Sequence, residues 1–78
     1  MSVLSILQDI FRDILDIEDF VLLRETTSDS IESWDSLAQI NIIAACENQF
    51  KIKFDLREIL KLKSAGDIVD NIEGKLKM

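Results

Sequence analysis

Ser36 is the residue whose type and position best support a chemical role in this chain of 78 residues. It stands in the run Trp34-Asp35-Ser36-Leu37, where an irregular stretch meets the expected start of a helix. Helix N-termini carry unpaired N–H groups and positive partial charge, so a phosphate held at this hydroxyl would be stabilised. Two roles follow for Ser36: the acceptor of a phosphodiester made by another enzyme, or, with Asp35, an ordinary helix cap.

Catalysis by the chain itself is not expected. The sequence has no histidine to take a proton from a serine, and no serine lies in a Gly-x-Ser-x-Gly turn. Acidic pairs such as Asp16 and Asp19 are available, but a solvated face explains them better than general acid–base chemistry. Enzymatic activity is therefore not predicted, and no catalytic residue is assigned.

Cys46 is the only cysteine, so no internal disulfide can form. It falls on the apolar side of an expected helix, where a thiol without a cationic neighbour has no reason to ionise. We therefore expect a small core residue. The lack of histidine and of carboxylates at metal-site spacing also argues against a transition-metal site.

The charge balance excludes several classes of partner. Nine basic residues face fifteen acidic ones, for a net charge of −6, which argues against nucleic-acid binding and against anionic membrane surfaces. The first sixteen residues lack the basic start of a signal peptide, and no apolar run is long enough to span a membrane. A monomer in the cytoplasm is the expectation.

The hydrophobic pattern predicts an all-α protein, a small four-helix bundle in a single domain over residues 1–78. Apolar residues at helical spacing predict long helices over 3–16 and 36–50. Starts that resemble capping boxes, at Asp55 and Ser64, predict a short third helix and a longer fourth.

Residues 17–35 lose the helical period and are expected to form a long loop over the bundle. A structureless connection of this length is uncommon in a compact domain and usually functional. Six apolar side chains are expected to hold it in place: Phe20, Val21, Leu22, Leu23, Ile31 and Trp34. Trp34 is expected to be the main anchor, with an exposed recognition role as the alternative.

The second helix has an unusual composition, because both of its sides are uncharged. Its expected core side consists of Ile40, Ile42, Ile43, Cys46 and Phe50. Asn41 and Asn48 point the opposite way, flanked by Leu37, Ala44 and Ala45. Such a helix is either buried on both sides or kept clear for a partner.

A small acidic helical chain in which Asp-Ser-Leu opens the second helix after a long loop resembles the acyl carrier protein family. Residues 42–52, IIAACENQFKI, are similar to the family's hydrophobic run followed by E-x-x-F-x-I. The starts of the third and fourth helices, at residues 55–59 and 64–68, look like those of the family. The resemblance covers essentially the whole chain.

This resemblance implies that a phosphopantetheinyl transferase moves 4′-phosphopantetheine from coenzyme A to Ser36. The thiol of that arm then holds acyl or aminoacyl groups as thioesters, which the carrier presents to a ligase and to downstream transferases. The second helix is the family's main recognition element. The positions that this implies for partner recognition are Asp35, Leu37, Ala38, Asn41, Ala44, Ala45 and Asn48.

Two departures from the family pattern point away from housekeeping fatty-acid synthesis. Ser33 and Trp34 replace the start of the family's frequent Gly-x-Asp-Ser-Leu, and Glu47 is the only acid on the second helix. Fatty-acid carriers usually expose acids there. The resemblance is therefore closer to a carrier for an aminoacyl, polyketide-like or surface-saccharide pathway, whose partners depend on contact more than on charge.

A second hypothesis does not need the arm. The chain could be an unmodified helical docking module that uses the neutral face of the second helix as an adaptor surface.

Overall fold

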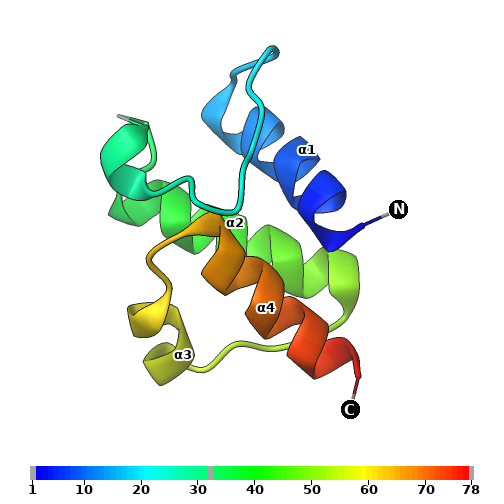
Figure 1. Cartoon of the computed structure of the whole chain (residues 1–78). Coiled ribbons are helices and arrows are strands. Elements are labelled where there is room, and N and C mark those ends of the chain that lie inside the picture. Colours follow the sequence, from blue (N-terminus) through cyan, green and yellow to red (C-terminus); the bar gives the residue numbers. More distant parts are fainter. Residues whose placement is uncertain (1, 32, 78) are drawn as a thin grey trace.

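A computed structural model describes residues 2–31 and 33–77 of the chain. Within them lie four α-helices: α1 (Val3–Leu15), α2 (Ser36–Phe50), α3 (Leu56–Lys61) and α4 (Ala65–Leu76). One 3₁₀ turn, η1 (Ser28–Ser30), interrupts the long connection between α1 and α2. The predicted all-α bundle with one short helix and a long first loop is confirmed (Figure 1).

Side-chain caps explain why the helices begin where they do. The Ser2 hydroxyl accepts a hydrogen bond from the Ser5 N–H at 3.1 Å at the start of α1. A full capping box formed by Asp55 and Glu58 begins α3. Another, formed by Ser64 and Asp67, begins α4. These local bonds satisfy N–H groups that the helices themselves leave without partners.

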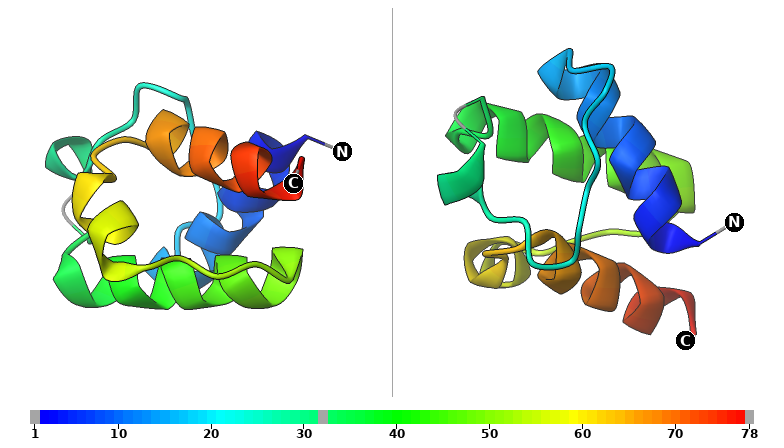
Figure 2. Two further views of the ribbon diagram at one scale, coloured as in Figure 1. Left: turned by 90° about the horizontal axis from the view of Figure 1, so that it is seen from below. Right: turned by 45° about the horizontal axis from the view of Figure 1, so that its top comes forward.

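The core lies where α1 packs against α2 and α4. Its most buried side chains come from these three helices and include Leu7, Phe11, Ile42, Cys46, Ile68 and Ile72. No described residue of α3 is fully buried, and α3 stands at one end of the molecule between α2 and α4 (Figure 2). The short helix therefore borders the bundle rather than completing its core.

The long loop is anchored by fewer side chains than the sequence predicts. Leu22, Ile31 and Trp34 are buried, with exposed fractions of 2, 8 and 5%. Val21 and Leu23 are wrong as anchors, since they are 61 and 49% exposed. These two residues flank Leu22, which is the one of the three that is buried in the core.

Backbone hydrogen bonds tie this loop to the start of α4. The Ala65 N–H donates to the Thr26 carbonyl at 2.8 Å, and the Gly66 N–H donates to the Arg24 carbonyl at 2.8 Å. The Arg24 guanidinium also reaches the Asp70 carboxylate at 2.8 Å. The middle of the loop is thus fixed against the start of α4.

No helix in the part of the chain that the structure describes is both long and apolar enough to cross a membrane.

Candidate functional site

Ser36 is the first residue of α2, and its side chain is exposed. The residue that caps α2 is Asp35: its Oδ1 accepts a hydrogen bond from the Ala38 N–H at 2.9 Å. Of the two roles that the sequence left open, capping therefore belongs to Asp35. The Ser36 hydroxyl stays available at the positive end of a helix of fifteen residues.

Trp34 fixes the chain just before this serine. Its indole Nε1–H donates to Gln39 Oε1 at 2.7 Å, and its ring meets the Phe11 ring edge-on with 4.8 Å between centroids. With 5% of its surface exposed, Trp34 is the anchor of the loop that the sequence predicts. A side chain held by both α1 and α2 leaves the backbone at Asp35 and Ser36 little freedom.

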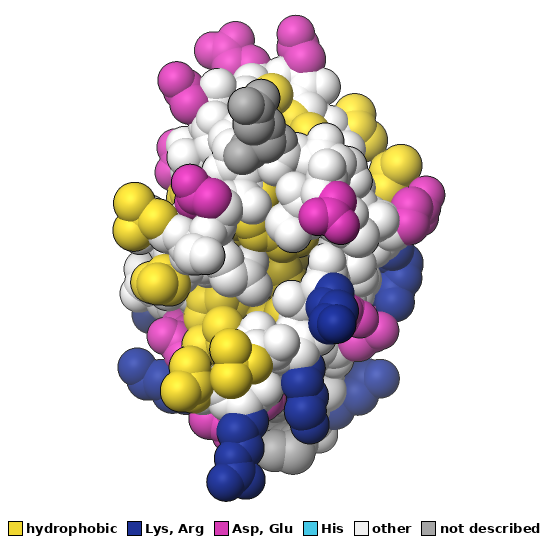
Figure 3. Space-filling model, turned by 90° about the vertical axis from the view of Figure 1, so that its left-hand side faces the viewer, with side chains coloured by type: hydrophobic (Ala, Val, Ile, Leu, Met, Phe, Trp, Pro, Cys, Tyr) yellow, Lys and Arg dark blue, Asp and Glu magenta, His cyan; other side chains and the backbone are white. Residues whose placement is uncertain are grey.

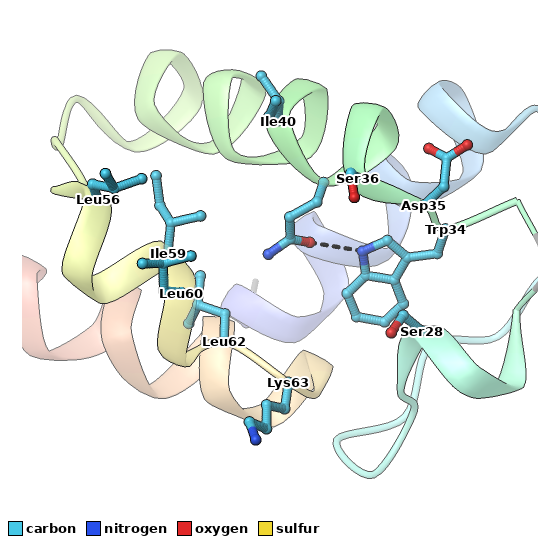
Figure 4. A pocket seen from close by; sticks show the side chains of 11 residues that line it. Ser28, Trp34, Asp35, Ser36, Ile40, Leu56, Ile59, Leu60, Leu62 and Lys63 are labelled. Carbon is cyan, nitrogen blue, oxygen red and sulfur yellow. Dashed lines mark hydrogen bonds between the residues drawn. The ribbon is translucent and has the colours of Figure 1, made fainter.

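A groove of about 490 Å³ begins at Ser36 and runs between α2 and α3. Its walls are largely apolar, with Trp34 and Ser36 at one end and Leu56, Ile59 and Leu60 across from them (Figure 4). The remaining lining residues are Ser28, Asp35, Gln39, Ile40, Leu62 and Lys63. In the space-filling view the surface is hollowed on this side and hydrophobic side chains gather there (Figure 3).

The structure keeps most of the predicted recognition positions on one exposed face. Asp35, Leu37, Asn41, Ala44 and Asn48 are exposed, and Ala45 is half-buried.

Ala38 is wrong as an outward residue, since only 8% of it is exposed. It lies one helical turn before Ile42, on the same buried stripe of α2.

Ile40 is wrong in the other direction. The sequence places it on the core side, yet it is 62% exposed. Its position four residues after Ser36 puts it on the same side of the helix as the exposed serine. The four-residue spacing from Ser36 indicates exposure of Ile40. Its apolar side chain and the neighbouring isoleucines favoured the prediction of burial instead.

Leu56 and Leu60 are functional candidates that sequence reasoning missed. They are 70 and 72% exposed and line the groove opposite Ser36. Their spacing of four residues on α3 indicates one apolar stripe. In the sequence that stripe is indistinguishable from a core contact, so only the packing of α3 reveals it as surface.

Cys46 takes no part in this site. Its side chain is fully buried, and burial, with a smaller contribution from the neighbouring Glu47 charge, raises the pKa of its thiol to about 12. The prediction of a core thiol is confirmed. Among residues 2–31 and 33–77, no cluster of three or more Cys, Asp or Glu side chains is arranged to hold a metal ion.

An exposed hydroxyl at a helix N-terminus, next to an apolar groove, suits attachment rather than catalysis. A phosphate bonded to Ser36 would meet the positive end of α2, and Lys63 brings a cation to the same groove. The groove has largely apolar walls, and its volume falls within the usual range of about 300–1,000 Å³ for ligand sites. The residues present therefore fit a phosphate-linked group with a long arm.

Comparison with known proteins agrees with this chemistry. Residues 5–72 match the family described as "phosphopantetheine attachment site". Among solved structures, the chain is similar to the solution NMR structure of a holo acyl carrier protein from Geobacter metallireducens. The TM-score is 0.91 and the identity 44%, over 99% of this chain and 88% of that one. No curated protein matches the chain.

Proposed function

The chain belongs to the acyl carrier protein family, and from this premise we propose that Ser36 is the residue to which its phosphopantetheine is attached. Members of this family are carriers rather than enzymes, and phosphopantetheine is their prosthetic group. The single observation that carries the proposal is the position of Ser36: exposed, first in α2, and next to a residue that already supplies the cap.

The residues around Ser36 have separable roles in this proposal. The N-terminus of α2 stabilises the negative charge of the phosphodiester. Asp35 holds the first turn of the helix, and Trp34 fixes the preceding loop through Gln39 and Phe11. The bound arm supplies a thiol that carries an acyl or aminoacyl group as a thioester. The apolar groove shields the part of the arm or cargo that lies against it from water.

Intact-mass spectrometry tests the attachment site. Incubation with coenzyme A and a broad-specificity phosphopantetheinyl transferase should add the mass of one arm to the wild-type chain. Ser36→Ala should gain nothing, whereas Ser33→Ala, a matched change at a neighbouring exposed serine, should gain the full mass. Because Asp35 keeps the cap, Ser36→Ala should change stability by no more than about 0.5 kcal/mol.

The same measurement separates this proposal from the adaptor hypothesis. A wild-type chain that gains no mass would favour an unmodified docking module. A Ser36→Ala chain that still gains the arm would move the attachment site to another serine.

We further infer that the carrier serves a specialised pathway, for aminoacyl, polyketide-like or surface-saccharide cargo, rather than housekeeping fatty-acid synthesis. The support is the exposed face of α2, where Leu37, Asn41, Ala44 and Asn48 carry no charge. The only acid of α2, Glu47, is half-buried, and its Oε2 accepts a hydrogen bond from the Phe54 N–H at 2.8 Å. The exposed face of this helix therefore offers no row of acidic side chains to an enzyme with a basic docking patch.

Loading-rate assays on Asn41→Glu/Asn48→Glu test this inference. The double variant should be a better substrate than wild type for fatty-acid synthesis enzymes with basic docking patches, and a poorer one for a dedicated ligase. Both positions are exposed, so the fold should tolerate the change. A wild-type chain that already serves fatty-acid enzymes well, with no effect of the glutamates, would end the specialised-pathway proposal and leave the carrier assignment intact.

A single domain over residues 1–78, a monomeric state and a cytoplasmic location complete the proposal. Sedimentation of the purified holo chain and fractionation of cells that contain it test the last two.

A further inference from the structure

The Gln39 side chain is held in one orientation beside the proposed attachment residue. Its Oε1 accepts a hydrogen bond from the Trp34 indole N–H at 2.7 Å, which is the dashed line in Figure 4. An indole nitrogen only donates, so the oxygen of the carboxamide has to face Trp34 and its NH₂ group has to face away from it. The hydrogen bond therefore fixes which end of the Gln39 amide is left to donate.

Gln39 and Ser36 lie on the same side of α2. They are three positions apart, a spacing that puts two helical side chains about 5–6 Å apart at Cβ. Both residues line the groove, where Gln39 is half-buried. Because the bond to Trp34 uses Oε1, both N–H groups of Nε2 are left over. The groove thus contains an oriented neutral donor one helical turn from the exposed hydroxyl.

The other polar side chains of the groove are less suited to hold a neutral group. Asp35 Oδ1 already accepts the Ala38 N–H, and a carboxylate has no proton to donate. Ser28 and Lys63 are exposed, and a lysine ammonium is a strongly hydrated charge on a flexible stem. Gln39 is therefore the polar group of the groove that is best placed to give a neutral ligand a fixed orientation.

We propose that Gln39 binds the phosphopantetheine arm by donating a hydrogen bond from Nε2 to an amide carbonyl oxygen of the arm. This rests on the proposed function, since the arm begins at Ser36. An amide carbonyl that lies against apolar walls loses its water and needs a donor in exchange. Gln39 supplies that donor, and Trp34 is a positioning residue that holds the other end of the carboxamide.

The phosphate of the arm is the other acceptor within reach of this part of α2. It is charged, and the N-terminus of α2 already stabilises it at Ser36. The carbonyls of the arm have no such partner. In a largely apolar site a small number of polar groups fixes the orientation of a ligand, and a neutral carboxamide matches a neutral amide.

NMR of the holo chain tests the proposal. The chain is loaded from coenzyme A that carries ¹³C at the amide carbonyls of the arm. One carbonyl signal should lie downfield of its position in free coenzyme A, because a carbonyl that accepts a hydrogen bond is deshielded. In the ¹⁵N-labelled chain the Gln39 NH₂ signals should shift between the apo and holo forms. The NH₂ signals of Gln49, exposed near the end of α2, are the reference and should stay in place.

Two substitutions at Gln39 separate binding of the arm from a structural role. Gln39→Glu keeps an oxygen for the Trp34 N–H and has no NH₂, whereas Gln39→Met loses both groups and adds no charge. Loss of the downfield carbonyl shift in both variants supports the proposal. A structural role predicts loss in Gln39→Met alone, and that outcome would overturn it. Gln49→Glu, the same change on the far part of α2, should keep the shift.

A change at Trp34 tests its positioning role. Trp34→Phe keeps an aromatic ring against Phe11 and removes the indole N–H, so the Gln39 carboxamide becomes free to turn. The downfield carbonyl shift should become smaller without disappearing. An unchanged shift would contradict the role of Trp34.

Intact mass is measured before any spectrum, so the two proposals fail in different ways. A chain that gains no arm overturns attachment at Ser36, and this inference with it. A loaded chain whose carbonyl signals match those of free coenzyme A overturns this inference alone. The same holds if Gln39→Met moves the ³¹P signal of the phosphodiester and no carbonyl signal.

Discussion

Lys75 Nζ lies 2.7 Å from Glu58 Oε2, and this ion pair joins the last turn of α4 to α3. The same ammonium group sits 5.3 Å from the centre of the Phe54 ring, in the segment that leads into α3. Because α3 contributes no fully buried side chain, contacts of this kind hold one wall of the groove against the bundle.

Loss of the Lys75 charge should loosen α3 more than it destabilises the whole fold. Lys75→Met keeps an apolar stem against Phe54 and removes the ammonium group. Amide hydrogen exchange within Leu56–Lys61 should become severalfold faster, while exchange in the core of α1 and α2 stays close to wild type. Lys77→Met, at an exposed position beyond the pair, is the control and should leave α3 unchanged. Uniformly faster exchange would indicate global destabilisation instead.

The same pair predicts a specific acid dependence. The hydrogen bond from Lys75, followed by that from the Asp55 N–H, lowers the pKa of Glu58 below its ordinary value of 4.5. A carboxyl whose pKa is lower in the folded state contributes stability above its unfolded pKa and loses it as pH falls through the folded value. Carbon-detected NMR titration of Glu58 should give a higher pKa in Lys75→Met than in wild type. An unchanged Glu58 pKa would mean that the ion pair does not form in solution.

Asp35 and Ser36 are neighbours with different expected costs of substitution. Asp35→Ala removes the acceptor for the Ala38 N–H and should destabilise the fold by about 0.5–2 kcal/mol. Asp35→Asn keeps a side-chain oxygen at the cap and should recover most of this loss. Urea denaturation of the three chains, with Ser36→Ala beside them, measures the difference. A larger loss for Ser36→Ala than for Asp35→Ala would contradict the assignment of the cap.

The Cys46 thiol should be inert in the folded chain. Its pKa of about 12 leaves almost no thiolate at pH 8, and its side chain is fully buried. A thiol assay with an aromatic disulfide should therefore detect no fast-reacting group in the apo chain and one in the holo chain, from the end of the arm. Addition of denaturant should expose one further thiol in both. A fast reaction of the folded apo chain would contradict the buried position.

Gly66 and Gly74 lie in the same helix and predict opposite effects of an added methyl group. A Cβ at Gly66 would lie 3.0 Å from the Arg24 carbonyl oxygen, which also accepts the Gly66 N–H. Gly66→Ala should therefore destabilise the fold by about 1–3 kcal/mol. A Cβ at Gly74 would have no described atom within 4 Å other than those of its chain neighbours and of the nearby helix backbone, so Gly74→Ala should stabilise by up to about 1 kcal/mol through helix propensity. Equal effects at the two positions would show that the loop does not approach α4 this closely.

Local sequence signals determined the helices and the position of the proposed attachment residue. α2 occupies the predicted range 36–50, and the boxes at Asp55 and Ser64 begin α3 and α4 as predicted. Each of these features depends on residues a few positions apart, so the local sequence is enough to specify it. The placement of Ser36 at the start of α2 follows from the same short-range signals.

The tertiary structure alone decided which sides of α2 and α3 are surface. α2 is uncharged on nearly every side, so its pattern cannot say that Ala38 is buried and Ile40 exposed. That depends on which side of α2 packs against α1. Leu56, Leu60 and Lys63 lie far from Ser36 in the sequence, yet the fold sets them on the same groove. Burial and charge around a site are sums over neighbours from the whole chain, whereas caps and helical periods are properties of adjacent residues.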